Sequence, residues 1–144
     1  MPREVMRNIY RIPVPLPNNP LRELNCYLIR GKDRSLLIDT GFRQETCRRA
    51  LFDGLQELNV RMEDTDIFLT HLHSDHTGLL PEVASAFSRV FIDDLDRDWI
   101  VGSTRFELER QEDARFAMAG IPPEMLRIAS QTHPGRCFAP AVKK

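Results

Sequence analysis

One short stretch, "FLTHLHSDHTGLL" at positions 68–80, constrains this chain more than any other. The chain has four histidines, and three of them fall within six residues together with an aspartate: His71, His73, Asp75 and His76. The run "DIFLT" at positions 66–70 is short and apolar, which predicts a buried strand. The fold must therefore let a buried strand end in a loop crowded with imidazole and carboxylate groups.

The spacing of these side chains is suited to metal binding. Side chains at positions i and i+2 of an extended chain leave on the same side, so His71 and His73 can converge on one point. His76 follows Asp75 directly and can join them only if the chain turns, which a helix beginning near Thr77 would allow. The loop can thus offer two imidazoles to one centre and a carboxylate plus an imidazole to a neighbouring centre, a ligand set that suits zinc, iron or manganese. The alternative is a polar loop whose histidines only form hydrogen bonds, but so many titratable groups in one loop favour the metal site.

The remaining segments alternate between strand-like and helix-like patterns. In residues 9–20 apolar residues alternate with prolines at positions 13, 15 and 17, which predicts an edge strand followed by a loop. The other expected strands are residues 25–30, 35–39, 66–70 and 89–93, and the expected helices are residues 43–59, 82–87, 94–119 with a break near 102–103, and 122–128. This order predicts one α/β (α+β) domain, followed by an irregular tail at residues 131–144.

Composition excludes several other classes of protein. The 144 residues suffice for about one domain, with 42% hydrophobic and 28% charged residues. A formal net charge of -1 without a basic stripe argues against a nucleic-acid partner. No apolar run approaches the ~20 residues of a membrane span, and the first residues contain no uninterrupted apolar segment of a signal peptide. Because Cys26, Cys47 and Cys137 are widely spaced, we expect free thiols in a reducing cytoplasm.

"THLHSDHTG" resembles the H-x-H-x-D-H motif of the metallo-β-lactamase superfamily. The earlier runs "NCYLI" and "LLIDTG" are similar to the strands that precede this motif in the family, so the resemblance covers roughly residues 8–93. It implies half of a four-layer αββα sandwich, which the family builds from two similar halves. Residues 1–93 would be the N-terminal half, 94–130 a helical insert or lid segment of the same domain, and 131–144 the tail.

The resemblance also implies roles for individual residues. His71 and His73 match the ligands of the first metal, and Asp75 and His76 match ligands of the second. Asp75 would also act in catalysis by orienting the nucleophile, while Asp39 would support the loop without binding metal. Redox members of the family place a carboxylate at position 73, so a histidine there favours a zinc hydrolase, although iron or manganese occurs among relatives.

The ligands that the family takes from its second half are not found in this chain. They are a third histidine for metal one, a bridging carboxylate and a last histidine. His133, in "THPGR", is only a doubtful ligand, because a lone loop histidine is usually structural or solvated. Asp93, Asp94 and Asp96 could resemble ligands, but acids at a helix N-terminus are the simpler interpretation.

For a complete protein the resemblance implies metal-dependent hydrolysis of a small molecule. Metal lowers the pKa of bound water from about 15.7 to about 7, so that hydroxide can attack an ester, thioester, lactone, amide or phosphodiester. Two alternatives stay open: a redox diiron member, and a non-catalytic half-domain completed by a partner. The 144-residue chain alone is expected to bind metal poorly, to be inactive, and to self-associate or be completed by a second half-domain.

The helical segment at 94–130 is predicted to cover the metal site as part of a substrate pocket. The alternative is a plain packing layer, because Met and aromatic stripes usually belong to a core. Its apolar residues are Phe106, Leu108, Phe116, Met118, Ile121 and Met125.

Overall fold

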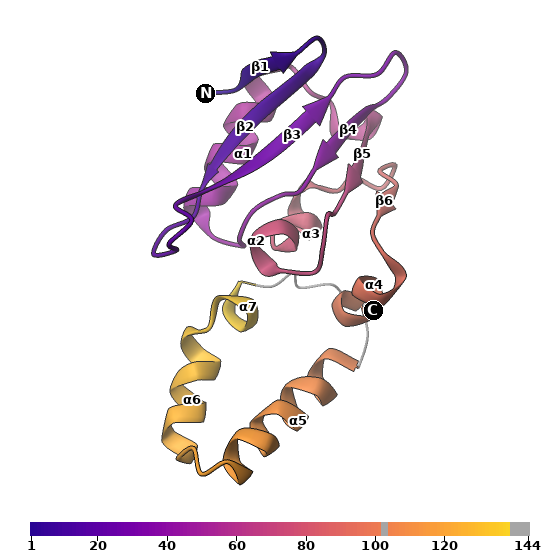
Figure 1. Cartoon of the computed structure of the whole chain (residues 1–144). Helices are drawn as coiled ribbons and strands as arrows, with labels where there is room; N and C mark the ends of the chain where they lie inside the picture. Colours follow the sequence, from indigo (N-terminus) through magenta and orange to yellow (C-terminus); the bar gives the residue numbers. More distant parts are fainter. Residues whose placement is uncertain (102–103, 139–144) are drawn as a thin grey trace.

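A six-stranded mixed sheet lies at the centre of the structure, a computed structural model that describes residues 1–101 and 104–138 (Figure 1). For residues 99, 101 and 104–108 only the backbone is described. The strands follow one another across the sheet in chain order: β1 (Arg3–Met6), β2 (Ile9–Pro15), β3 (Glu23–Ile29), β4 (Ser35–Ile38), β5 (Thr65–Phe68) and β6 (Val90–Phe91). Neighbours from β1 to β4 are antiparallel, and β4, β5 and β6 are parallel, so the predicted α/β class is confirmed.

The proline-rich strand β2 is an edge strand over only part of its length. Residues 9–11 pair with β1 on one side and β3 on the other, so the prediction of an edge is wrong for this part. Pro13 and Pro15 pair with β3 alone and lie beyond the end of β1. Proline has no backbone N–H to donate to an adjacent strand. The prolines therefore lie in the part of β2 that has a neighbouring strand on one side only.

One face of the sheet is covered by helix α1 (Glu45–Glu57), which confirms the helix predicted at 43–59. Its apolar side chains recur three or four residues apart, so they share one face of the helix. These residues and the strand side chains opposite them are buried and form the core: Cys47, Leu51 and Leu55 from α1, and Ile12, Leu28, Leu37 and Ile67 from the strands.

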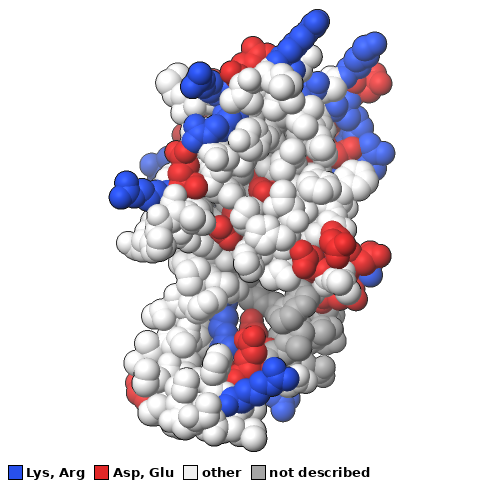
Figure 2. Space-filling view, in the orientation of Figure 1, with Lys and Arg blue, Asp and Glu red and all other residues white. Residues whose placement is uncertain are grey.

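The opposite face of the sheet carries a row of side chains that no described helix covers. Residues paired across neighbouring strands project to the same side, and the register defines this row as Arg11, Tyr27, Ile38, Phe68 and Phe91. Phe68 is 42% exposed and Phe91 46% exposed. Figure 2 shows mostly uncharged surface in the middle of this view, with Lys and Arg gathered toward the upper edge.

Short helices follow β5 at the end of the sheet: α2 (Ser74–Thr77) and α3 (Leu80–Val83). The first begins at Ser74 rather than near Thr77. The helix predicted at 82–87 is wrong beyond Val83, because the hydroxyls of Ser85 and Ser88 both donate to the Met62 carbonyl, which fixes a turn instead. A 3₁₀ turn, η1 (Met62–Asp64), precedes β5.

The last helices form an arm that leaves the sheet and returns to it (Figure 1). They are α4 (Asp94–Val101), α5 (Thr104–Met118), α6 (Pro123–Thr132) and α7 (Pro134–Cys137). The expected break near 102–103 falls outside the described residues. Residues 131–137, predicted to be irregular, are mostly helical, because Pro134 begins α7 and the His133 side chain accepts the Gly135 N–H. Within the described residues, no helix has the length and apolar character that a membrane span needs.

Candidate metal centre

The histidine loop lies at the carboxyl end of β5, beside the segment that follows the parallel strand β4. Hydrogen bonds join the two segments: Asp39 N donates to Phe68 O at 3.0 Å, and Thr40 N and Oγ1 each donate to His76 O at 2.8 Å. The carboxyl ends of parallel strands are the usual place for a binding site in an open α/β sheet. The chain therefore brings residues 39–40 and 70–76 together although about thirty positions separate them.

Asp39 is buried at the base of this loop and holds two of its side chains. Its carboxylate accepts the Thr70 N–H at 2.9 Å and the Thr70 hydroxyl at 2.8 Å, and its Oδ2 lies 2.8 Å from His76 Nδ1. The residue has a φ of 59°, in the left-handed region that aspartate tolerates better than most side chains. The predicted supporting position thus fixes the loop backbone and the orientation of one imidazole.

The four predicted ligands form two neighbouring pairs. His71 Nε2 lies 3.0 Å from His73 Nδ1, and His76 Nε2 lies 3.5 Å from Asp75 Oδ2. The rings of His71 and His76 are adjacent, with centroids 4.0 Å apart. The structure therefore brings together all four side chains that the spacing singled out.

These separations are close to the distance between two ligand atoms bound to the same metal ion. Two ligands at the ~2.0–2.1 Å distance of tetrahedral zinc lie about 3.4 Å from each other. The two observed separations, 3.0 and 3.5 Å, fall on either side of that value. Among the described residues, however, no group of three or more His, Cys, Asp or Glu side chains is arranged to hold a metal ion. Each pair thus offers two ligands, and a full site needs further ligands.

Thr70 helps to determine which ring nitrogens face each other. Its hydroxyl oxygen lies 3.1 Å from His71 Nδ1 and 3.2 Å from His76 Nδ1, and Asp39 also contacts the second of these nitrogens. With both Nδ1 atoms engaged, the Nε2 atoms of the two rings face the paired ligands. Hydrogen bonds of this kind commonly fix the tautomer and orientation of metal-binding histidines.

The surroundings of His71 favour its neutral form. Burial lowers the pKa of His71, and the neighbouring His76 and His73 lower it further, while the carboxylates of Asp39 and Asp75 oppose this shift. Neutral imidazole is the form that binds a metal ion. The lowered pKa of His71 therefore favours the protonation state in which its ring could bind a metal ion.

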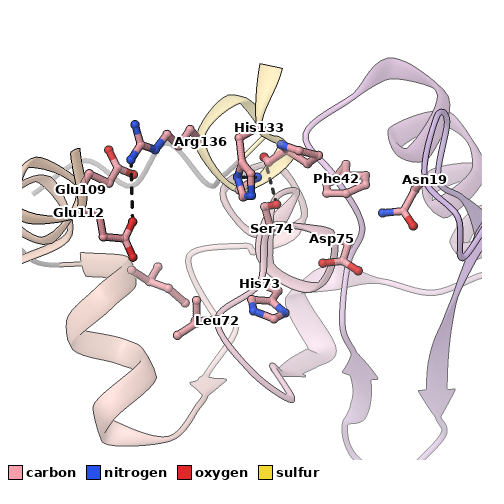
Figure 3. A pocket seen from close by; sticks show the side chains of 13 residues that line it. Asn19, Phe42, Leu72, His73, Ser74, Asp75, Glu109, Glu112, His133 and Arg136 are labelled. Atoms are coloured by element: carbon pink, nitrogen blue, oxygen red, sulfur yellow. Dashed lines mark hydrogen bonds and ion pairs between the residues drawn. The ribbon is translucent and has the colours of Figure 1, made fainter. Parts of the chain in front are cut away.

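A cavity of about 550 Å³ opens beside the histidine loop (Figure 3). In that view Glu109, Glu112 and Arg136 lie together at one side, away from Asp75 on its loop. The cavity is lined by Asn19 and Phe42, by Leu72, His73, Ser74 and Asp75 of the loop, by Ile100, Glu109 and Glu112 of α4 and α5, and by His133, Pro134, Gly135 and Arg136.

The segment at 94–130 contributes to this pocket, but not through the predicted apolar face. Phe116, Met118 and Met125 are exposed on the arm, and the side chains of Phe106 and Leu108 fall outside the described ones. Phe116 and Met118 are two positions apart on α5, so they cannot share one face of a helix. Instead, the pocket residues of this segment are Ile100, Glu109 and Glu112.

Helix α7 forms a wall of the pocket that the sequence analysis missed. The Ser74 hydroxyl donates to Pro134 O at 3.2 Å, and the rings of Phe42 and Phe138 pack with centroids 5.4 Å apart. At Gly78 the approach is so close that a Cβ atom would lie 2.6 Å from Phe138 O. The run "HPG" at positions 133–135 could have predicted the start of this helix, because proline is common at the first helical position.

His133, the doubtful ligand, lines the same cavity as His73 and Asp75. Its Nδ1 accepts the Gly135 N–H at 3.2 Å, so it serves as the N-terminal cap of α7. This is a structural role of the kind expected for it.

The aspartates after β6 lie at the start of α4. Asp93 Oδ1 accepts the Leu95 N–H at 2.9 Å, and Asp94 and Asp96 lie in the first turn, as expected for helix N-terminal acids. Asp96 does more, because its Oδ2 accepts the backbone N–H of Leu72 in the histidine loop at 3.1 Å.

Comparisons with known proteins agree with this fold. Residues 20–90 match the model of the metallo-beta-lactamase superfamily. A probable metallo-hydrolase of Bacillus subtilis, YqjP, is 38% identical over 71 residues, which are 49% of this chain and 21% of the relative. An uncharacterized protein of the same organism, YobT, is 29% identical over 101 residues, or 69% of this chain and 41% of the relative.

Solved structures give the same result. A metallo-beta-lactamase family protein from Thermus thermophilus superposes with a TM-score of 0.60 and 29% identity, over 97% of this chain and 48% of that protein. The matched segment and the mixed α/β fold together support membership of the metallo-beta-lactamase superfamily. It spans about half the length of the Thermus protein, and less than half of both Bacillus relatives.

Proposed function

We propose that this chain carries the first metal-binding loop of a metal-dependent hydrolase that acts on a small molecule. The observation that supports the proposal most directly is the 3.0 Å separation of His71 Nε2 and His73 Nδ1, beside the pair formed by Asp75 and His76. The superfamily implies a divalent metal, and imidazole with carboxylate ligands suits zinc, with iron or manganese as alternatives.

Each residue of the loop has a distinct role in this proposal. His71 and His73 would hold one metal, and Asp75 and His76 a second. When bound, zinc lowers the pKa of water so that hydroxide is available near neutral pH. Asp39 orients the His76 ring and is not itself a ligand.

The pocket residues would bind and shield the substrate. Asp75 lines the cavity and could orient the attacking nucleophile, which makes it the proposed catalytic residue. Phe42, Leu72 and Ile100 provide apolar lining that excludes water around the reacting bond. A cavity of about 550 Å³ is within the usual size of a small-molecule site. The bond cleaved would be that of an ester, thioester, lactone, amide or phosphodiester.

A second candidate is a half-domain that a partner completes. It is favoured by the uncovered row of Tyr27, Ile38, Phe68 and Phe91 on the sheet, because apolar surface of this kind usually contacts another layer. In this case the partner would also supply the missing ligands. A cytoplasmic location remains a prediction under both candidates.

Zinc titration of the purified chain by calorimetry tests the proposed ligands. Because each described pair supplies two ligands where catalytic zinc has three, we expect weak binding and no turnover of ester or phosphodiester substrates by the chain alone. His71→Ala and Asp75→Ala should each weaken zinc binding at least about tenfold. Asp94→Ala, which changes an exposed acid of α4 that pairs with Arg97, is the control and should bind like the unaltered chain.

The outcome that contradicts the proposal is equally specific. If His71→Ala and Asp75→Ala bind zinc as the unaltered chain does, the loop is not the metal site. Tight binding of two metals with turnover that His71→Ala abolishes would confirm the site and show that the chain needs no further ligands.

A further inference from the structure

Leu72 lies between the two histidines of the first pair, and its backbone has an unusual partner. The Leu72 N–H donates to Asp96 Oδ2 at 3.1 Å. Asp96 is 24 positions further along the chain, in the first turn of α4. A carboxylate from a separate helix therefore holds the peptide between His71 and Leu72, in the backbone that connects the two histidines.

The same face of α4 makes a second approach to the loop. Ile100 follows Asp96 by four positions, so the two side chains lie one above the other on the helix. Ile100 lines the cavity together with Leu72. Helix α4 thus meets the loop both at its backbone and at the pocket surface.

The start of α4 is itself well anchored. Leu69 N donates to Phe91 O at 2.9 Å, which ties β5 to β6 immediately before the helix. Asp93 then caps the helix through the Leu95 N–H. Asp96 is therefore placed by the sheet, and it can transmit that placement to the loop.

The convergence of His71 and His73 depends on the peptide between them. Residues 70–72 form a bend after β5, and the rings of His71 and His73 meet only while the backbone of that bend keeps its shape. Rotation of the Leu72 peptide would separate the two ring nitrogens that now lie 3.0 Å apart. A hydrogen bond donated to an ionised acceptor is among the stronger constraints available to such a peptide.

We propose that Asp96 is a positioning residue that holds His71 and His73 in register for metal binding. The effect of Asp96 on metal affinity rests on the proposed function. Its effect on the positions of the two histidine rings concerns the metal-free chain. Asp96 does not touch the metal or the substrate in this proposal. It acts only through the Leu72 amide.

Three variants separate this role from general effects of charge. Asp96→Ala removes the acceptor, whereas Asp96→Asn keeps an oxygen that can accept the Leu72 N–H. Asp94→Ala is the matched control, because Asp94 is an exposed acid of the same helical turn, and its carboxylate pairs with Arg97. All three are compared with the unaltered chain by thermal unfolding, so that a misfolded variant is recognised.

The metal-free chain is measured first, by amide hydrogen exchange and by NMR of the histidine rings. In Asp96→Ala we expect the Leu72 amide to exchange about tenfold faster. The contact between the His71 and His73 rings, whose centroids lie 4.6 Å apart, should also be lost. Asp96→Asn and Asp94→Ala should keep both signals. Unchanged Leu72 exchange or retained ring contacts in a folded Asp96→Ala variant would overturn the proposal.

Zinc affinity is measured next, and here the two proposals can fail separately. Loss of an outer hydrogen-bond partner typically weakens metal binding about 10–100-fold. We expect that loss for Asp96→Ala and near-normal affinity for the other two variants. Equal affinity in all variants despite accelerated Leu72 exchange would refute the positioning role. If even the unaltered chain bound no zinc, the proposed function would fail, while the ring contacts would still decide the role of Asp96.

Discussion

Asp39 accepts hydrogen bonds from the backbone and hydroxyl of Thr70 and contacts His76 Nδ1, all from a buried position. Its neighbours Thr70 and His76 follow β5, whereas Asp39 follows β4. At the scale of single residues, one carboxylate therefore joins the ends of two parallel strands. A residue in this position should affect both the stability of the fold and the orientation of the His76 ring.

Asp39→Asn tests that role. Asparagine tolerates the left-handed backbone as aspartate does, but one of its two oxygens becomes an amide donor, so at least one contact loses its acceptor. We expect the free energy of unfolding to fall by about 1–3 kcal/mol in urea denaturation. Asn59→Asp, at an exposed position with a φ of 51°, is the control and should leave the midpoint unchanged. A folded Asp39→Asn chain with an unaltered midpoint and unaltered His76 ring signals would contradict the assigned role.

Contacts between side chains of the candidate site were predictable where the two residues are close in the sequence. The spacing of His71 and His73 predicted convergence from strand geometry, and the two rings do meet, although residues 70–72 form a bend after β5 and do not continue the strand. Asp39 was placed by family resemblance rather than by the pattern of residues. The contact of Asp96 with Leu72 spans 24 positions and depends on where α4 begins after β6, so no local pattern could reveal it.

At the scale of elements, Asp66 links three parts of the sheet edge. Its carboxylate on β5 accepts hydrogen bonds from Arg34, which precedes β4, and from Arg89, which precedes β6. Arg34 also donates to Phe87 O in the loop between α3 and β6. These contacts hold the short strand β6 against the sheet, and the bonds from Arg89 and then Arg34 hold the pKa of Asp66 well below its usual value.

This shift predicts how stability depends on pH. Since the folded pKa lies below the unfolded value of about 3.9, the contribution of Asp66 is fully present above about pH 4. It is lost as the pH falls through the folded pKa. Asp66→Asn should lower the urea midpoint at pH 7, and its difference from the unaltered chain should shrink between about pH 4 and pH 2. Asp64→Asn, at an exposed acid paired with Arg61, should change neither quantity. A constant difference across the acid range would refute this account.

Elements were predictable where apolar periodicity is strong. The helix over 43–59 and the strands at 25–30, 35–39 and 66–70 were confirmed because their buried residues recur with the period of each structure. Strand β1 and helix α7 were missed, since β1 is fully exposed and α7 has only four residues. The helix predicted at 82–87 failed where serine side chains compete for the backbone.

At the scale of the whole molecule, the two faces of the sheet differ. One carries the core beneath α1, while the other exposes the row that contains Tyr27, Ile38, Phe68 and Phe91 (Figures 1 and 2). The class of fold was predictable from the order of strand-like and helix-like segments along the chain. What covers the second face is not contained in the pattern of a single chain. The expectation of self-association or completion by a second half-domain therefore remains a prediction.

That prediction can be tested with one residue on the uncovered face. Apolar surface on an open sheet favours association, and a charge on that surface opposes it. We expect the unaltered chain to sediment as a species larger than a monomer, and Phe68→Glu to shift it toward the monomer. Phe87→Glu is the matched control, because Phe87 is 71% exposed in the loop before β6 and not on the sheet. Its sedimentation should equal that of the unaltered chain. If the unaltered chain sediments as a folded monomer at all concentrations, this face of the sheet needs no partner. If both variants shift the sedimentation equally, association depends on general hydrophobicity rather than on the sheet.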